Sequence, residues 1–537
     1  MQQPVAAADA GEIRTNDVGG PYAWYVLGVL VLVYMINFID RQIISILAED
    51  IKRDLGASDA DMGFLYGTAF GVFYSLFGIP LGRLADMWYR GRLMTIGLAV
   101  WSGMTALSGF AQNFIMLAAA RVGVGVGEAT ASPCAFSMIS DYFPKERRAT
   151  ALAIYSSGLY LGGGLSLFIG GAIVQSWNAA YPGGGPLGLA GWQAAFLAVG
   201  LPGLLLALWV ATLREPARGM ADGFITPRDP DPWPKFFTEL SSIVPPLTIF
   251  HAATHGLRAL TVNLVALALI ALGAWALIAL TGDLLQWLAI GLGTYAVFSW
   301  SQSLKMRDPA TYRLIWGTPT FVMTVVGFGL IAFGTYALSF WGAPYAIREF
   351  AQPLLDAGLP LPWYAETKWI GLFLGGGGAA SGFIGVILGG AIADRLRRTN
   401  PAGRILVGFI AMLGSAPLVI WQFTTDTLPL FYVLAFVNGV FASMWVGVAA
   451  ATTQDLVLPR MRGAATATYF LGTTFLGLAL GPYFVGKVSV LTGDLGIACM
   501  SVLVVAPITL TCLYLVYRSL PQAEASRFER CGERPGG

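Results

Sequence analysis

Four ionisable residues lie inside apolar stretches of the first half of the chain: Asp40, Arg41, Arg121 and Glu128. A charged side chain at the centre of a bilayer costs at least about 2.5–3.5 kcal/mol, so such residues usually bind substrate, carry protons or pair with one another. We therefore expect these four residues to form a site for substrate binding or proton coupling. The alternative is a static ion pair that joins two helices.

The spacing of these residues indicates their depth in the membrane. Asp40 lies seven residues before the end of one apolar stretch, and Arg121 lies seven residues after the start of another. Both should therefore lie roughly 10 Å below the same membrane edge. Glu128 follows Arg121 by two helical turns on the same helix face, which places it near the middle of the membrane.

Each of the four residues has an expected role. Asp40, at the depth of Arg121, is expected to be the constant partner of that arginine and a second acidic candidate for proton coupling. Glu128 is the main candidate for proton coupling, because burial favours its neutral form and Arg121 favours its charged form. Protonation of Glu128 would free Arg121 to bind an anion. Arg41 is a further substrate-binding candidate, although its side chain should point about 100° away from that of its neighbour Asp40.

The chain that must position these residues is strongly apolar. Of its 537 residues, 56% are hydrophobic and 12% are charged, and the mean hydropathy is +0.66. Soluble domains are about a quarter charged, so the composition predicts an all-α polytopic membrane protein. The formal net charge of +2 gives no reason to expect a nucleic-acid partner.

A bilayer needs roughly 20 apolar residues per helix. This length predicts two series of six helices with two extra helices between them. The expected spans are 22–47, 62–82, 93–112, 114–140, 147–176 and 192–213, then 259–280 and 284–304, then 319–345, 369–393, 404–424, 428–457, 462–490 and 494–518. The expected divisions are a segment 1–21, a first bundle 22–215, a linker with the extra helices 216–315, a second bundle 316–518 and a tail 519–537. The extra helices carry almost no ionisable residues, so we expect them to be peripheral and to have no part in transport chemistry.

The basic residues predict an orientation. Loops and termini assigned to one side hold 25 of the 32 Lys and Arg residues, and the loops of the other side hold only Lys52, Arg53, Arg348, Lys368 and Lys487. Short cytoplasmic loops are rich in Lys and Arg. Both termini are therefore expected in the cytoplasm, in a multi-pass protein of the cell membrane. The first twenty residues lack the pattern of a cleavable signal peptide.

Two loop patterns recur at nearly one spacing. Gly82-Arg83-Leu84-Ala85-Asp86, followed by Arg90 and Arg92, is echoed by Gly390-Ala391-Ile392-Ala393-Asp394-Arg395. The segment around Arg148 is echoed around Arg462, 314 residues later. Two matches at similar offsets indicate a duplicated six-helix unit.

These residues resemble the major facilitator superfamily, whose signature loop contains the G-x-L-A-D pattern. The stretches Asn37–Arg41 and Arg121–Ala129 resemble the Spinster family within it. The resemblance implies two six-helix bundles with substrate bound between them near the midplane, and it implies that the intramembrane acidic and basic residues bind substrate and couple protons. It also implies that Asp86 caps a helix of the opposite bundle and holds the cytoplasmic side shut. The conformational gate is expected to comprise Gly82, Arg83, Asp86, Arg90, Arg92, Asp394 and Arg395.

The chain departs from the resemblance at two points. Met87 stands where the loop signature usually has Arg. The extra helical pair is not typical of Spinster proteins, although proton-coupled peptide transporters have one at the same place.

Further candidates for the cavity wall lie in the second half. Asn438, Trp445 and Tyr345 are expected to bind substrate, and Gln422 is a weaker candidate; packing or interface anchoring is the alternative for the two aromatic residues. His251 and His255 without a third ligand make a poor zinc site, so no metal or cofactor is expected. The sequence also lacks a Ser–His pairing of the kind that would indicate an enzyme.

We therefore expect a secondary active transporter that works by alternating access, couples to protons and carries a lipid-like or amphiphilic anion. One alternative is an organic-anion or sugar-acid symporter with protons. A non-transporting membrane sensor is the alternative of another class. The expected partners are the substrate, protons and membrane lipids, and the expected state is a monomer.

Overall fold

The structure is a computed structural model that describes residues 18–182, 184–223 and 227–531. The flanking segments 1–17 and 532–537, which include Arg14 and Arg534 of the predicted basic set, lie outside the described residues. The first bundle contains α1 (Pro21–Leu55), α2 (Asp59–Gly63), η2 (Phe64–Thr68), α3 (Ala69–Met87), α4 (Arg90–Ser108), α5 (Phe114–Glu128), α6 (Ala131–Tyr142), α7 (Lys145–Ala180) and α8 (Gly191–Ala211).

The linker between the bundles is helical. It contains α9 (Pro232–Ile243), α10 (Leu247–Thr254), α11 (Leu257–Thr281), α12 (Leu284–Arg307) and α13 (Pro309–Ile315). The second bundle contains α14 (Pro319–Ala346), η5 (Ile347–Ala351), α15 (Gln352–Asp356), α16 (Thr367–Thr399), α17 (Leu406–Gln422), α18 (Leu428–Ser443), α19 (Trp445–Asp455), α20 (Arg462–Gly472), η9 (Thr473–Ala479), α21 (Leu480–Thr492), α22 (Leu495–Met500) and α23 (Ala506–Ala525), followed by α24 (Arg527–Cys531).

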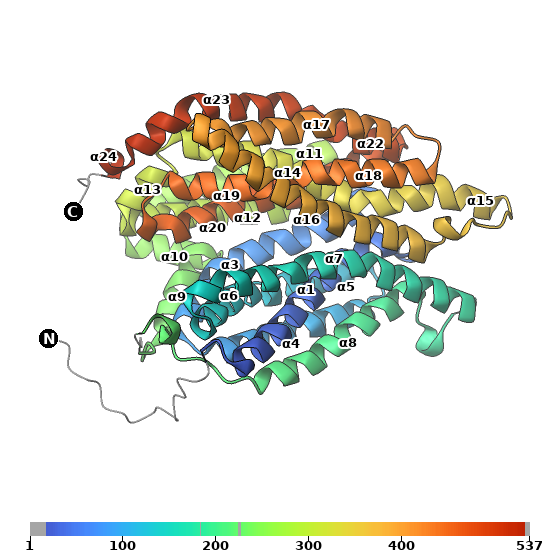
Figure 1. The fold of residues 1–537 in the computed structure, drawn as a ribbon, viewed down its shortest axis with the longest axis horizontal. Helices are drawn as coiled ribbons and strands as arrows, with labels where there is room; N and C mark the ends of the chain where they lie inside the picture. Colours follow the sequence, from blue (N-terminus) through green and yellow to red (C-terminus); the bar gives the residue numbers. More distant parts are fainter. Residues whose placement is uncertain (1–17, 183, 224–226, 532–537) are drawn as a thin grey trace.

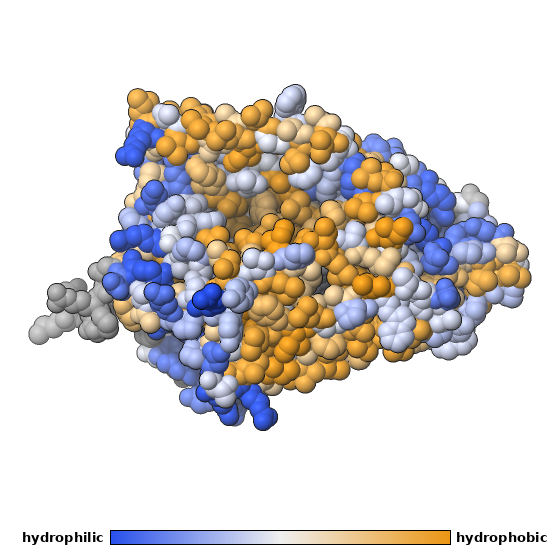
Figure 2. Space-filling view, turned by 90° about the horizontal axis from the view of Figure 1, so that it is seen from above, coloured by the Kyte–Doolittle hydropathy of each residue, from blue (hydrophilic) through white to orange (hydrophobic). Residues whose placement is uncertain are grey.

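The two bundles lie side by side with their long axes parallel (Figure 1). One end of the molecule carries α9, α10, α13 and α24; we call it the terminal end. The other end carries α15 and α22, and Arg348, shortly before α15, bonds there to Asp59 at the start of α2; we call it the opposite end. Figure 2 shows apolar side chains over the middle of one face and polar side chains at both ends. Helices satisfy their own backbone hydrogen bonds, which is what an apolar, water-free surrounding requires.

The predicted fold class is confirmed, with differences in detail. Within the described residues, twelve helices are long and apolar enough to cross a membrane. The expected spans 93–112 and 284–304 are also helices, α4 and α12, but they are not among those twelve. These two helices are more polar than the twelve. Helix α4 contains Arg90 and Arg92, and helix α12 contains Gln286 and further Ser and Gln residues. Helix α23 continues past residue 518, the end of the last expected span, to Ala525.

Close backbone contacts hold the bundles together toward the opposite end. A Cβ atom on Gly67 would lie 2.2 Å from the carbonyl oxygen of Leu478, and one on Gly63 would lie 2.4 Å from that of Pro482. Small residues let helices approach to this distance in membranes. The π-helical segments η2 and η9 meet here, and Thr68 donates a hydrogen bond to the carbonyl oxygen of Ala479 at 2.8 Å.

The extra helices differ from each other in packing. None of the most apolar 18-residue window of α11 is buried, so the expectation of a peripheral position holds for this helix. It is wrong for α12, which packs against α3 and η2 and buries a face that includes Gln286, Gly293, Ala296 and Trp300. The network of polar contacts between the two helices centres on Asn263, which donates to Ser299 at 3.0 Å and to Gln302 at 2.8 Å.

Candidate functional site

A buried ion pair lies between α1 and α5. The Arg41 guanidinium donates to a Glu128 carboxylate oxygen at 2.7 Å, and the exposed fractions of the two side chains are 12% and 0%. The same guanidinium lies over the rings of Phe70 and Phe38, at 4.4 Å and 4.8 Å from the ring centroids. Aromatic faces attract a cation, so these rings stabilise the charge of Arg41.

Arg121 is fully buried beside this pair, and its bonding differs from the expectation. It donates to the main-chain carbonyl oxygen of Asp40 at 3.2 Å, which confirms that the two residues share one depth. The expected carboxylate–guanidinium bond is absent, because both carboxylate oxygens of Asp40 lack a hydrogen-bond partner among the described residues. The partner of Glu128 is thus Arg41, and not Arg121 as we expected. The register of α1 places the Arg41 side chain toward Glu128, which residue spacing on separate helices could not reveal.

Unpaired polar atoms surround Asp40. Within the described residues, the Nε and Nη2 atoms of Arg121, the Oγ1 atom of Thr105 and the Oε1 atom of Glu128 are buried without a hydrogen-bond partner. Buried polar groups are normally paired, so each unpaired one calls for an explanation. A cluster of this kind at mid-depth can accept or release a proton, or accept water, with little rearrangement of the helices.

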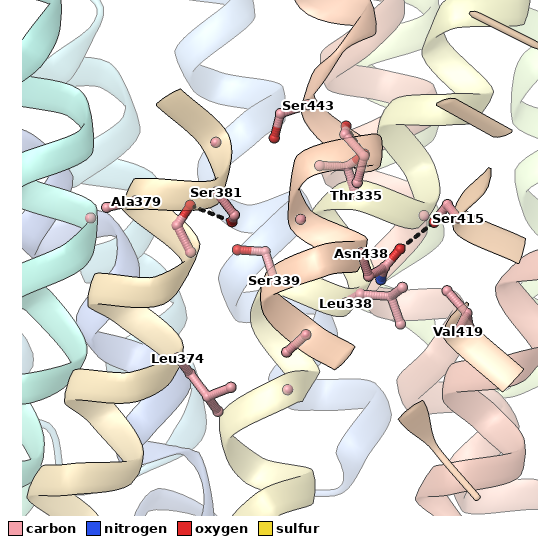
Figure 3. A pocket seen from close by; sticks show the side chains of 18 of the residues that line it. Thr335, Leu338, Ser339, Leu374, Ala379, Ser381, Ser415, Val419, Asn438 and Ser443 are labelled. Atoms are coloured by element: carbon pink, nitrogen blue, oxygen red, sulfur yellow. Dashed lines mark hydrogen bonds between the residues drawn. The ribbon is translucent and has the colours of Figure 1, made fainter. Parts of the chain in front are cut away.

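A cavity of about 290 Å³ lies between the bundles and extends into the second one (Figure 3). Its wall comes from α1 and α7 of the first bundle and from α14, α16, α17 and α18 of the second. Among the described residues that line it, none is Asp, Glu, Lys, Arg or His. Its polar groups are hydroxyls and amides set in an otherwise apolar wall: Gln42, Tyr160, Thr335, Ser339, Ser381, Ser415, Gln422, Asn438 and Ser443.

The ion pair lies directly behind the cavity wall. Phe38 and Gln42, which flank Asp40 and Arg41 on α1, both line the cavity, and Arg41 lies over the Phe38 ring. Gln42 accepts a hydrogen bond from the Tyr66 hydroxyl at 3.0 Å. A charged group bound in the cavity would therefore be separated from Arg41 by one aromatic ring.

The three candidates of the second half are placed differently. Asn438 lines the cavity, accepts a hydrogen bond from Ser415 and donates to Gln422 at 3.4 Å (Figure 3). Tyr345 lies outside it, stacked on Phe431 in an aromatic cluster toward the opposite end. Trp445 also lies outside it, stacked on Phe328 with its indole N–H bonded to the carbonyl oxygen of Ala442 at 2.8 Å.

Comparisons with known proteins agree with this architecture. Residues 30–482 match the family model described as Major Facilitator Superfamily. The chain belongs to the major facilitator superfamily. It is 26% identical to an MFS-type efflux pump of Mycolicibacterium smegmatis over 92% of this chain and 91% of that protein. It is also 26% identical to protein spinster homolog 1 of Xenopus laevis, over 88% of this chain and 74% of that protein.

Solved structures show the same fold. A bacterial homologue of the human lysosomal transporter Spinster, in an inward-facing and occupied conformation, superposes with a TM-score of 0.63 at 23% identity, over 96% of this chain and 98% of that chain. The likeness to Spinster proteins that the sequence predicted is therefore confirmed. As a member of this superfamily, the chain is a multi-pass transmembrane transporter and not an enzyme.

The superfamily loop between α3 and α4 lies at the terminal end, where its residues have two kinds of environment. Asp86 and Arg83 are exposed, and Asp86 makes no hydrogen bond or ion pair with any residue that the structure describes. Arg90 is fully buried and pairs with Asp141 and Glu215 inside the first bundle. Of the remaining gate candidates, Arg92 lies over the Tyr89 ring, Gly82 is half-buried, and Asp394 and Arg395 are exposed.

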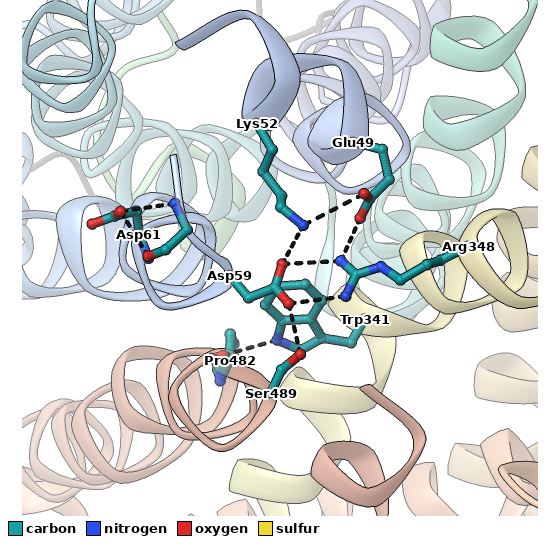
Figure 4. Close-up of polar contacts among 9 residues, drawn as sticks. Glu49, Lys52, Asp59, Asp61, Trp341, Arg348, Pro482 and Ser489 are labelled. Atoms are coloured by element: carbon teal, nitrogen blue, oxygen red, sulfur yellow. Dashed lines mark hydrogen bonds and ion pairs between the residues drawn. The ribbon is translucent and has the colours of Figure 1, made fainter. Parts of the chain in front are cut away.

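The opposite end of the interface is closed by a cluster that sequence reasoning missed. Arg348 of the second bundle bonds to Asp59 at 2.9 and 3.0 Å and to Glu49 at 2.7 Å, both in the first bundle (Figure 4). Ser489 of α21 donates to Asp59 at 2.6 Å, and Lys52 pairs with Asp59. The only signal in the sequence was that three of the few basic residues assigned to this side, Lys52, Arg53 and Arg348, lie at the end of α1 and in η5, directly after α14. Their partners could not be known without the packing.

Proposed function

We propose that this transporter is a proton-coupled carrier for an amphiphilic anion, working by alternating access as a monomer in the cell membrane. The observation that carries the proposal is that the Arg41–Glu128 pair lies between two helices of the first bundle, one ring away from an uncharged cavity between the bundles. Removing one partner of a buried ion pair leaves an uncompensated charge, which is strongly unfavourable. A proton that neutralises Glu128 therefore leaves the charge of Arg41 unpaired, which favours the binding of an anion there.

The four intramembrane residues have different roles in this proposal. Protonation of Glu128 releases Arg41, and an anionic group of the substrate takes the place of the carboxylate. Arg121 holds α1 against α5 through the Asp40 carbonyl oxygen. The unpaired carboxylate of Asp40 is the second proton site. This assignment moves the anion-binding role from Arg121 to Arg41, because Arg41 is the residue bonded to Glu128.

The orientation follows from the distribution of basic residues. The terminal end carries the loops that hold most Lys and Arg residues, so it faces the cytoplasm, as do both termini. The direct bonds between the bundles gather at the opposite end, through Arg348, Asp59 and Ser489. The arrangement described here is therefore the inward-open one of the alternating-access cycle, and the loop that contains Asp86 closes the terminal end in the other.

The cavity supports an amphiphilic substrate. Leu338, Leu374 and Val419 make part of its wall apolar, while Asn438 and Ser415 present uncharged hydrogen-bonding groups (Figure 3). An anionic head near Arg41 with an apolar or weakly polar body in the cavity fits both environments.

The size and polarity of the cavity favour a second candidate, an organic-anion or sugar-acid symporter. A volume of about 290 Å³ is at the lower limit of ligand pockets, which span roughly 300–1,000 Å³. The hydroxyl and amide groups of the wall could bind the hydroxyls of a sugar acid. Thermal-shift measurements with lysophosphatidic acids of increasing chain length and with glucuronate distinguish the two, since a ligand that binds the folded form raises its Tm.

The test of proton coupling is uptake into proteoliposomes with and without an imposed pH gradient. Glu128→Gln is expected to abolish gradient-driven accumulation and to retain substrate binding and exchange, because the glutamine leaves Arg41 available to the anion. Glu529→Gln is the matched control, since Glu529 is exposed in α24 and lies outside the helices that are long and apolar enough to cross a membrane. Full gradient-driven accumulation by Glu128→Gln would disprove the coupling role and leave Arg41–Glu128 as a static pair.

A further inference from the structure

The turn between α11 and α12 is bonded to the second bundle at the opposite end. The Asp283 carboxylate pairs with Lys487 at 2.8 Å and accepts a hydrogen bond from the Tyr483 hydroxyl at 2.6 Å. Lys487 also donates to the carbonyl oxygen of Thr281, and the ring of Trp287 packs edge-on against Tyr483 at 5.6 Å. These contacts all reach α21, so this turn is fastened to one bundle only.

The middle of α12 touches both bundles at one residue. A Cβ atom on Gly293 would lie 2.3 Å from the ring of Phe475 in η9 and 2.9 Å from the side chain of Val72 in α3. Helix α12 therefore lies across the junction where the two bundles meet. Gly293 allows this approach because any side chain at that position would meet atoms of both bundles.

The last turns of α12 are linked to the first bundle through α9. Arg307 forms a two-bond ion pair with Glu239 of α9 at 2.7 and 3.1 Å. Helix α9 packs on α3, with the rings of Trp233 and Trp88 at 5.2 Å. Ala296 and Trp300 of α12 share a buried cluster with Val72 and Leu76 of α3.

We propose that the α11–α12 hairpin is a strap that stabilises the arrangement with the opposite end closed. It is fastened to the second bundle at its turn and rests on the first bundle along α12 and α9. When a carrier alternates, the two bundles rotate against each other, so contacts that include both bundles in one arrangement cannot all persist in the other. The hairpin contacts made here are therefore a bias toward this arrangement, whatever the substrate is.

A matched pair of glycine substitutions tests the strap. Gly293→Ala inserts a methyl group between Phe475 and Val72, whereas Gly273→Ala makes the same change on α11, where nothing lies within 4 Å of the new atom. Distances between spin labels at Ala179 and Leu355, on the two bundles at the opposite end, report the populations after replacement of the native cysteines. Gly293→Ala is expected to raise the ratio of long to short distances at least threefold, and Gly273→Ala to leave it unchanged.

A second pair of variants tests the fastening at the turn. Lys487→Met removes the bond to Asp283, and Arg53→Gln removes an ion pair at the same end that lies within the first bundle. Lys487→Met is expected to shift the distances in the same direction as Gly293→Ala, with Arg53→Gln unchanged. If Lys487→Met fails to fold, Tyr483→Phe removes one hydrogen bond to the same carboxylate and serves instead. Wild-type distributions in both Gly293→Ala and the turn variant would overturn the proposal.

Discussion

The two six-helix bundles share their packing at the terminal end and differ at mid-depth. In the first bundle, buried Arg90 pairs with Asp141 and Glu215; in the second, buried Arg404 pairs with Asp455 at 2.7 Å and with Glu524 at 2.8 Å. Arg90 and Arg404 are 314 residues apart, the same offset as the predicted repeat. The duplicated unit thus retains its terminal-end ion pairs in both copies.

At mid-depth the copies no longer match. The first bundle buries Asp40, Arg121 and Glu128 and holds Arg41 nearly buried, while the wall of the second presents only uncharged groups such as Asn438 to the cavity. The ion pairs at the terminal end therefore occur in both bundles, and the ion pair at mid-depth occurs in the first bundle only. On the proposed function, this difference separates the charges that stabilise each bundle from those that take part in transport.

The largest effect on the free energy of unfolding is expected from breaking the mid-depth pair of Arg41 and Glu128. Arg41→Ala leaves Glu128 buried without its counter-charge, which should lower the free energy of unfolding by about 3–5 kcal/mol. Arg53→Ala on the same helix removes a side chain that is 68% exposed and should have almost no effect. Thermal unfolding of the purified protein measures both.

The double variant Arg41→Ala/Glu128→Gln checks the cause of that effect. It removes both charges and should regain most of the stability that Arg41→Ala loses. A double variant as unstable as the single one would show that Arg41 acts through packing on Phe38 and Phe70, and not through its charge.

An intermediate effect is expected at the repeated ion pairs, and it should be alike in the two copies. Arg90→Ala and Arg404→Ala each remove a guanidinium that pairs with two carboxylates, which should cost about 2 kcal/mol each. Because the two clusters lie in different bundles, the costs should add in the double variant. A cost at one site that is less than half of the other would show that the copies have diverged at the terminal end as well.

A smaller free-energy change, in the balance between the two arrangements, is expected at the opposite end, where the bundles are joined to each other. Arg348→Gln removes the bonds to Asp59 and Glu49 (Figure 4) and should shift the balance of arrangements by about 1 kcal/mol, or about fivefold, away from the one seen here. Spin-label distances at Ala179 and Leu355 measure this shift. Arg53→Gln, which breaks no bond between the bundles, is the control, and an equal shift in both variants would contradict the assignment.

The sequence predicted the fold and the common level of Asp40 and Arg121, because these depend on apolar length and on spacing along one helix. It did not predict that Arg41 is the partner of Glu128 or that Tyr345 and Trp445 lie outside the cavity. Those facts depend on how each helix is rotated, and helices that are apolar on all faces give little periodicity from which rotation can be read. The position of α12 between the bundles depended on Gly293, whose role is visible only beside Phe475 and Val72.

The smallest effect is expected from Asp86→Asn, which compares the loop between α3 and α4 with its copy in the second bundle. Asp86 is exposed here and lacks a bonded partner among the residues that the structure describes, so neutralising it should leave the Tm unchanged. Its charge should act only when the terminal end closes, where a carboxylate at a helix N-terminus is worth about 0.3–1 kcal/mol. The ratio of the two populations, measured from distances between labels at Thr150 and Arg398, should therefore shift up to about fivefold toward the arrangement with the terminal end open. Asp394→Asn should shift them less, because Ala391 stands in that loop where Arg83 stands in the first. An unchanged distribution in Asp86→Asn would reduce Asp86 to a turn residue, and equal shifts in both variants would show that the two loops gate alike.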